Sequence, residues 1–160
     1  MNADEQPFRI SEVTLDERTI ARRGPEIEHE RQVAIFDLLE ESFFKPMNSP
    51  GGPYGLSLGI EDNRLHINIR TAEDPQHGTV ILALSPFRRI VKDYFLVCES
   101  YYDAIKNAAP AQIEAIDMGR RGLHNEGSEL LIERLEGKID LDMDTARRLF
   151  TLICVLHIKL

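Results

Sequence analysis

The middle of the sequence alternates between apolar and polar residues with the period of two that is typical of strands with one buried face. Residues 56–60 and 65–69 both follow this pattern, and the turn between them reads Glu-Asp-Asn-Arg, a composition that tolerates the backbone angles of a tight hairpin. A second turn at 74–78 leads into an apolar run over 79–84. Three such segments in succession predict an antiparallel β-meander.

A shorter alternation over residues 8–15, with a register break near Ser11, predicts a strand before the meander. Four other segments combine proline or capping residues with helical apolar spacing, which predicts helices at about 25–41, 86–107, 110–137 and 145–158. The last segment is apolar on nearly every side in its second half, so we expect it to be either the innermost helix or part of a subunit interface. The predicted fold class is α+β: an antiparallel β-meander, with an N-terminal strand, packed against about four α-helices in a single domain over residues 1–160.

Residues 45–55 contain three prolines and three glycines, which predicts a loop because neither a helix nor a central strand tolerates that composition. Loops of this length can serve as lids or binding arms, but most are surface connections, and we favour the connection. This is the only linker-like stretch, and the chain has no repeats or low-complexity tracts.

The composition argues against two classes of partner. A net charge of −8 disfavours non-specific binding to nucleic acid or to an anionic membrane, because both require a positive field. The longest apolar run, 149–156, is too short to cross a bilayer, and the first residues lack the hydrophobic run of a signal peptide. Cys98 and Cys154 lie in apolar helical contexts, as buried cysteines of a reducing compartment do. We therefore expect a cytoplasmic protein that binds neither nucleic acid nor membrane.

Arginine dominates the positive charge, with fourteen arginines against five lysines. Eight of these arginines form adjacent pairs, at 22–23, 88–89, 120–121 and 147–148. Arginine suits fixed, bidentate contacts to carboxylate or phosphate. The 27 acidic residues offer internal partners, so ion pairs within the protein or between subunits are the favoured interpretation, and a ligand-binding anion site is the alternative.

The segment 117–129 places three glycines and many polar residues inside the third predicted helix. Each interior glycine costs a helix roughly 0.5–1 kcal/mol relative to alanine, so either a neighbour approaches the backbone closely there or the helix breaks. In a continuous helix, Asp117, Arg121 and either His124 or Asn125 share one face, and Arg120 and His124 are likewise four residues apart. A kinked helix whose polar groups satisfy one another is the competing structural interpretation.

Two functions remain open for this segment. The leading hypothesis is a non-enzymatic binding or regulatory module that recognises an acidic partner or a small anionic ligand through Arg120, Arg121 and Asn125. The alternative is an enzyme of acid/base or phosphoryl-transfer type centred on His124, with Glu126 or Glu129 assisting. We also expect a homodimer, because the last helix is apolar on most sides and the second carries four aromatic residues: Tyr94, Phe95, Tyr101 and Tyr102.

No metal or cofactor is predicted. Glu26-x-x-His29 is half of a di-iron motif, but no second Glu-x-x-His occurs. The aspartates at 140, 142 and 144 imitate the start of a calcium loop, but Thr145 and Thr151 stand where glycine and a bidentate glutamate are required. The chain also lacks the glycine-rich nucleotide motifs and the serine-hydrolase elbow.

Several blocks of the sequence resemble one family over nearly the whole chain. They are V-T-L-D-E-R-T-I-A-R-R from Val13, P-E-I-E-H-E-R from Pro25, L-S-P-F-R-R from Leu84, C-E-S-Y-Y from Cys98, R-R-G-L-H-N-E-G from Arg120 and T-A-R-R-L-F-T-L from Thr145. Together they are similar to uncharacterised protein family 0262, known chiefly from alphaproteobacteria. The resemblance implies a small, soluble, single-domain cytoplasmic protein, and it implies no activity or catalytic residues.

Overall fold

The structure, a computed structural model, describes residues 6–20 and 24–156. Its main sheet has four strands in the order β1-β3-β4-β5, with β1 at Ile10–Leu15, β3 at Tyr54–Glu61, β4 at Arg64–Arg70 and β5 at Gly78–Ala83. Strands β3, β4 and β5 form the predicted antiparallel meander, whereas β1 pairs with β3 in parallel. The register of β1 shifts between Ile10 and Glu12, at the predicted break. The α+β prediction is confirmed.

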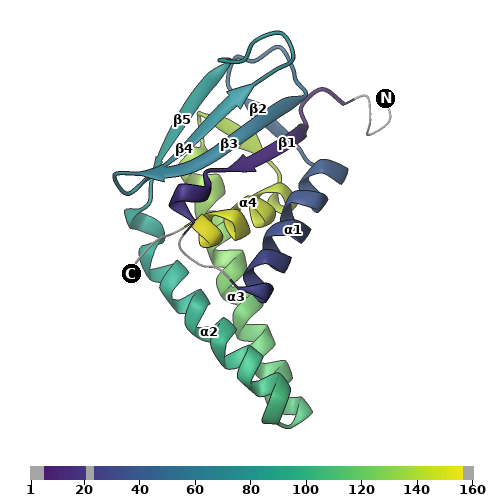
Figure 1. Cartoon of the computed structure of the whole chain (residues 1–160), viewed down its shortest axis with the longest axis vertical. Coiled ribbons are helices and arrows are strands. Elements are labelled where there is room, and N and C mark those ends of the chain that lie inside the picture. The colour runs from purple at the N-terminus through teal and green to yellow at the C-terminus, as the bar shows by residue number, and fades with distance from the viewer. Residues whose placement is uncertain (1–5, 21–23, 157–160) are drawn as a thin grey trace.

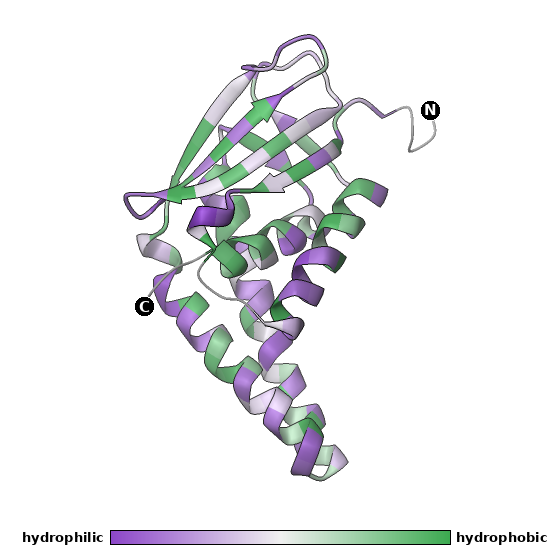
Figure 2. Cartoon of the chain, in the orientation of Figure 1, coloured by the Kyte–Doolittle hydropathy of each residue, from purple (hydrophilic) through white to green (hydrophobic). Residues whose placement is uncertain are grey.

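The turn between β3 and β4 forms as the sequence predicts. Asp62 and Asn63 have φ angles of 52° and 59°, the left-handed region that these two residue types tolerate best after glycine. The tight turn sets the register of the hairpin and points Leu58 and Ile67 to the same buried face. Figure 2 shows the resulting alternation of hydropathy along the strands.

The described residues form four α-helices on the buried side of the sheet: α1 at Pro25–Glu40, α2 at Arg88–Asn107, α3 at Pro110–Leu135 and α4 at Met143–Leu156. Helix α4 lies directly beneath the sheet (Figure 1). Short 3-10 turns at Glu17–Thr19 and Ser85–Phe87 follow β1 and precede α2. Helices α2 and α3 form a long hairpin that extends away from the sheet, past the ends of α1 and α4 (Figure 1). The sheet and α4 therefore make one end of the molecule, and the tip of the hairpin makes the other.

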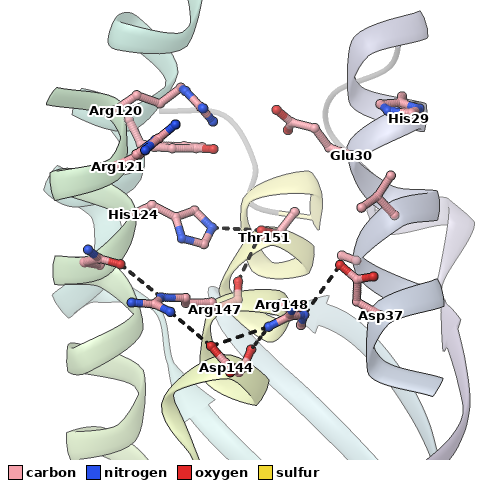
Figure 3. Close-up of a pocket in the computed structure, with 14 residues that line it drawn as sticks. His29, Glu30, Asp37, Arg120, Arg121, His124, Asp144, Arg147, Arg148 and Thr151 are labelled. Carbon is pink, nitrogen blue, oxygen red and sulfur yellow. Dashed lines mark hydrogen bonds and ion pairs between the residues drawn. The ribbon is translucent and has the colours of Figure 1, made fainter. Parts of the chain in front are cut away.

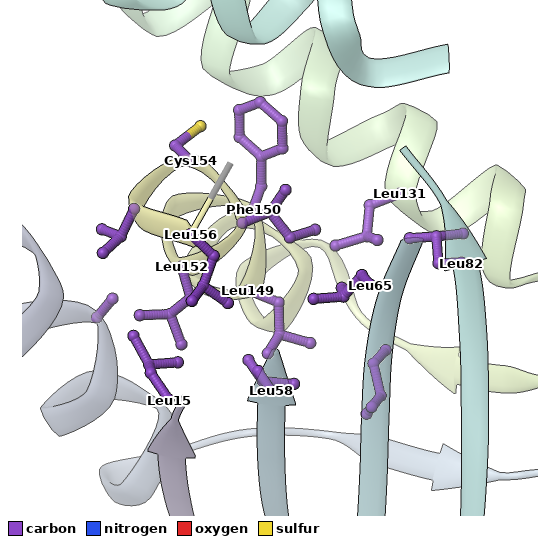
Figure 4. Close-up of a cluster of buried hydrophobic side chains, with 14 of the residues drawn as sticks. Leu15, Leu58, Leu65, Leu82, Leu131, Leu149, Phe150, Leu152, Cys154 and Leu156 are labelled. Atoms are coloured by element: carbon purple, nitrogen blue, oxygen red, sulfur yellow. The ribbon is translucent and has the colours of Figure 1, made fainter. Parts of the chain in front are cut away.

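The last helix is the innermost one, as predicted. Asp142 caps it, because its carboxylate accepts a hydrogen bond from the Thr145 amide at 2.9 Å. Figure 4 shows Leu149 and Leu152 of α4 facing Leu15 and Leu58 of the strands. Nine residues of α4 are buried: Thr145, Ala146, Leu149, Phe150, Leu152, Ile153, Cys154, Val155 and Leu156.

The predicted loop at 45–55 is shorter in the structure, which corrects that prediction. Lys45 and Pro46 belong to a short strand, β2 (Phe44–Pro46), that pairs with β6 (Ile139–Leu141) in an antiparallel two-stranded sheet. The proline fits there because such a small ladder leaves one edge of each strand without a partner strand. The remaining loop is tied down by a hydrogen bond from the Met47 amide to the Lys138 carbonyl and by another from the Gly52 amide to the Pro7 carbonyl. These tethers favour a surface connection over a lid.

Candidate functional site

A cleft of about 530 Å³ lies where α1, α3 and α4 meet (Figure 3). This volume is within the range of about 300–1,000 Å³ that is typical of small-molecule sites. Most of its lining side chains are charged or polar, with a smaller apolar contribution from α1 and α2. The residues are His29, Glu30, Val33, Ala34, Asp37, Tyr94, Arg120, Arg121, His124, Asn125, Asp144, Arg147, Arg148 and Thr151.

Helix α3 contributes the wall that the sequence predicted. The helix is continuous from Pro110 to Leu135 despite its glycines, so the alternative of a broken helix is not realised. Arg120 and His124, Arg121 and His124, and Arg121 and Asn125 are three or four residues apart, so these side chains lie along one side of the helix, which lines the cleft. The structure therefore brings together four of the five candidate residues of this segment, and Glu126 is the exception.

Glu126 is exposed and does not line the cleft, and the same holds for Glu129. A residue two positions along a helix from His124 faces a different direction, which separates Glu126 from the imidazole. The pairing of His124 with either glutamate, expected under the enzyme hypothesis, is therefore absent among the hydrogen bonds and ion pairs of residues 6–20 and 24–156.

Helix α4 contributes a second arginine pair, which the sequence did not place in the same site. Asp144, Arg147, Arg148 and Thr151 form the polar stripe of an otherwise buried helix, at spacings of three, four and seven. This polar stripe was the sequence signal that could have placed α4 in the site, because four polar residues at helical spacing in an apolar helix mark a face that does not pack against the core. Helix α1 adds His29, Glu30 and Asp37 on the opposite wall.

The arginines of α3 are held by one carboxylate. Asp117 accepts hydrogen bonds from Arg120 at 2.6 and 3.0 Å and lies 2.9 Å from Arg121. The hydrogen bond from Arg120 lowers the pKa of the Asp117 carboxyl, so it stays ionised. Arg120 also lies over the Tyr101 ring, 4.9 Å from its centroid, whereas 73% of the Arg121 side chain is exposed. The predicted ion pairs within the chain are therefore present at Arg120 and Arg121, whereas the arginine pair at 22–23 lies outside the described residues. Arg121 still presents donors to solvent.

The arginines of α4 are held less completely. Arg147 donates to the Asn125 side-chain oxygen at 3.1 Å and to Asp144 at 3.0 Å. Arg148 donates to the Asp144 carbonyl at 2.9 Å, and its Nε lies 3.6 Å from the Asp37 carboxylate. That Nε is buried and has no hydrogen-bond partner. Asn125 therefore positions Arg147 in the cleft.

His124 projects from the α3 wall into the cleft as a neutral imidazole. Its ring packs against Tyr94 and Phe150, with centroids 5.4 and 5.2 Å away. Burial lowers its pKa to about 4, and the charges of Arg120 and Arg147 act in the same direction. Its Nε2 lies 2.8 Å from the Thr151 hydroxyl, which donates its own hydrogen to the Arg147 carbonyl at 3.2 Å. When the Thr151 hydrogen points to that carbonyl, Nε2 donates to the Thr151 oxygen and Nδ1 is the acceptor nitrogen.

A second hollow of about 630 Å³ lies on the outer face of the sheet, bordered by Ser57, His66 and Asn68 of β3 and β4. Asp16 and Arg18 form an ion pair at 3.0 Å there, and Glu61 also lines the hollow. Within residues 6–20 and 24–156, no cluster of three or more histidine, cysteine or acidic side chains has a geometry that could hold a metal ion. No helix in this part of the chain is long and apolar enough to span a membrane.

Comparison with known proteins identifies the family. The model of Uncharacterised protein family (UPF0262) matches residues 7–159. A UPF0262 protein of Rhizobium meliloti strain 1021 is 62% identical over 157 residues, which is 98% of each chain. UPF0262 proteins of Agrobacterium fabrum and Azorhizobium caulinodans are 59% and 58% identical; the matches cover 94% and 99% of this chain and 95% and 99% of theirs. No solved structure matches the chain. The chain belongs to the UPF0262 family.

Proposed function

We propose that this member of the family is a binding module for a small anionic ligand, which the cleft between α1, α3 and α4 holds without chemical conversion. The observation that carries the proposal is the convergence of two adjacent-arginine pairs, from α3 and α4, on one cleft. Arginine is always charged and presents its donors in a planar fork that matches carboxylate and phosphate.

The guanidinium groups are oriented before any ligand arrives. Asp117 and the Tyr101 ring fix Arg120, and Asn125 fixes Arg147. Binding to donors that are already fixed costs less conformational entropy than binding that must first order the arginine side chains. Asn125 thus acts by positioning Arg147, in addition to the contact with the ligand that the sequence suggested.

A small ligand suits this cleft better than the acidic protein partner. Only Arg121 is mostly exposed among the four arginines, and Arg120 retains 28% of its side-chain exposure. A folded acidic surface would therefore reach Arg121 first and the recessed donors poorly. A carboxylate- or phosphate-bearing small molecule can enter a cleft of this volume and contact donors from both helices.

The enzyme hypothesis has weaker support. A neutral His124 could accept a proton, but acid/base catalysis by histidine usually relies on a partner that orients the ring and stabilises the imidazolium. Its Nε2 contacts the Thr151 hydroxyl, and the nearest charges that act on it are the cations of Arg120 and Arg147, which disfavour protonation. These surroundings support a role for His124 as a fixed, neutral hydrogen-bonding group.

Arg121→Ala provides the direct test. We expect inorganic phosphate and small dicarboxylates to raise the melting temperature of the wild-type protein, because a ligand that binds only the folded state stabilises it by mass action. Loss of one charge-assisted contact, about 2 kcal/mol, should weaken binding about 30-fold in Arg121→Ala. The unliganded variant should stay within about 0.5 kcal/mol of wild type, since the side chain is exposed.

Arg89→Ala is the matched control, because Arg89 also belongs to an adjacent pair but lies on α2 with 92% of its side chain exposed and does not line the cleft. It should bind like the wild type. Anions that shift wild type and Arg121→Ala equally, or that shift neither, would refute the proposed site. Turnover of a phosphorylated metabolite that depends on His124 would instead favour the enzyme.

A further inference from the structure

The two long walls of the cleft carry opposite charges. Arg120 and Arg121 project from α3, and Glu30 and Asp37 project from α1 on the other side (Figure 3). The four arginines face three carboxylates in the lining, so the cleft is polarised and is not uniformly positive. A simple anion would meet favourable charge on one side and repulsion on the other.

The two carboxylates of α1 differ in their partners. Asp37 lies 3.6 Å from the Arg148 guanidinium, so its charge is balanced within the chain. Glu30 makes no ion pair within the part of the chain that the structure describes; its Oε1 accepts one hydrogen bond, from the Tyr102 hydroxyl at 3.1 Å. Burial raises the pKa of the Glu30 carboxyl, as expected for a carboxylate that no adjacent cation compensates.

Glu30 faces the cationic wall across the cleft. The charge of Arg120 acts on Glu30, yet the two groups are farther apart than an ion pair. Figure 3 shows the Glu30 carboxylate pointing into the space in front of Arg120 and Arg121. The cleft thus separates a fixed carboxylate from fixed guanidinium groups, and a molecule between them would satisfy both only if it carried charges of both signs.

We propose that the ligand is a small zwitterion, of the amino-acid or phosphorylated-amine type, whose ammonium group binds Glu30 and whose carboxylate or phosphate binds Arg120 and Arg121. This inference rests on the proposed function and adds the second charge to it. An ammonium group has three donors, and Glu30 has an oxygen that Tyr102 does not use. The hydrogen bond from Tyr102 fixes the Glu30 carboxylate before the ligand arrives.

Pairs of probes with matched skeletons isolate the ammonium group. L-glutamate is compared with glutarate, and O-phosphoethanolamine is compared with ethyl phosphate, with dissociation constants measured by calorimetry on the full chain. The pairs also separate the carboxylate from the phosphate source of the anion. We expect at least one zwitterion to bind about tenfold more tightly than its partner without the amine, which is somewhat less than the full value of one charge-assisted contact because the ammonium group must also lose water.

Glu30→Gln identifies the residue responsible. Glutamine keeps an oxygen that accepts from Tyr102 and removes a partly buried charge, so the variant should fold. It should lose the tenfold preference and bind glutarate or ethyl phosphate at least as well as the wild type. Glu40→Gln, which alters an exposed carboxylate on the same helix outside the cleft, should keep the preference.

The outcomes separate this inference from the proposed function. If no probe of either kind binds, the anion site itself is absent. If glutarate and ethyl phosphate bind as tightly as their zwitterionic partners, the cleft is a plain anion site and the zwitterion is excluded. A preference that survives in Glu30→Gln would overturn the assignment of the ammonium to Glu30.

Discussion

Gly127→Ala is expected to lower the free energy of unfolding by about 3 kcal/mol, the upper part of the usual range for overpacking a core. A Cβ at this position would lie 2.2, 2.4 and 2.6 Å from three atoms of the Phe150 ring, far inside van der Waals contact. Phe150 is fully buried and packs against Phe87, Tyr94 and His124, so its ring has no free space to move into. Chemical denaturation of both proteins measures the difference directly.

Gly122→Ala is the matched control on the same helix. Nothing lies within 4 Å of the Cβ that the substitution adds, so the methyl group creates no clash and the gain in helix propensity remains. We expect this variant to be more stable than the wild type by about 0.5–1 kcal/mol. Equal effects at the two positions would contradict the view that Gly127 alone is required for the close approach of α3 to α4.

These glycines show why the local pattern was informative but incomplete. From the sequence, three glycines in nine residues predicted either a close approach or a broken helix. The structure shows a close approach at Gly127 only, in a helix that continues through Gly119 and Gly122. Which glycine meets a neighbour depends on where Phe150 of α4 lies, and that is fixed by packing between helices and not by the sequence of either one.

The same distinction separates the predicted from the unpredicted parts of the fold. The β3–β4 hairpin and the four helices follow from periodicity and turn residues within short windows, and all of them form. The parallel pairing of β1 with β3 and the pairing of β2 with β6 join segments far apart in the chain. No short window encodes such pairings, and the three-residue strands β2 and β6 have too few residues to show a period.

The residues of the candidate site also differ in whether a short stretch of sequence could predict them. Arg120, Arg121, His124 and Asn125 share a face of one helix, so helical spacing alone predicted that they act together. Arg147 and Glu30 come from helices that meet α3 only in the folded chain. The adjacent arginine pair that includes Arg147 was visible in the sequence, but nothing in the sequence assigned it or Glu30 to a cleft shared with α3.

The residues that led us to expect a homodimer are largely buried within the chain itself. The apolar sides of α4 pack against the sheet and the neighbouring helices, and Tyr94 and Phe95 of α2 are also in the core. A homodimer stays a prediction. The residues that now favour it are exposed apolar residues of the α2–α3 hairpin: Leu96, Ile105 and Met118. Light scattering gives the mass that decides it.

Acidification is expected to destabilise the protein through His124, in a window set by its two pKa values. In the unfolded chain the imidazole has a pKa of about 6.5, and in the folded chain burial lowers that pKa to about 4. Between these values the unfolded state binds the proton and the folded state does not, so each step toward lower pH favours unfolding. The contribution of neutral His124 is therefore complete above about pH 6.5 and is lost as the pH falls toward 4.

From pH 7 to pH 5 this linkage should remove about 2 kcal/mol from the free energy of unfolding. Glu30 acts in the opposite direction, because a carboxyl whose folded pKa is raised adds stability at low pH and loses it as the pH rises. The measurement is therefore the change in the free energy of unfolding from pH 7 to pH 5, compared between the wild type and His124→Gln. This change should be smaller in His124→Gln, whatever the stability of the variant at pH 7. His29→Gln is the control for the loss of a histidine side chain, because His29 is exposed and lines the same cleft. If wild type and His124→Gln lose stability in parallel, His124 takes up a proton in the folded protein over this pH range and its assignment as a neutral group is incorrect.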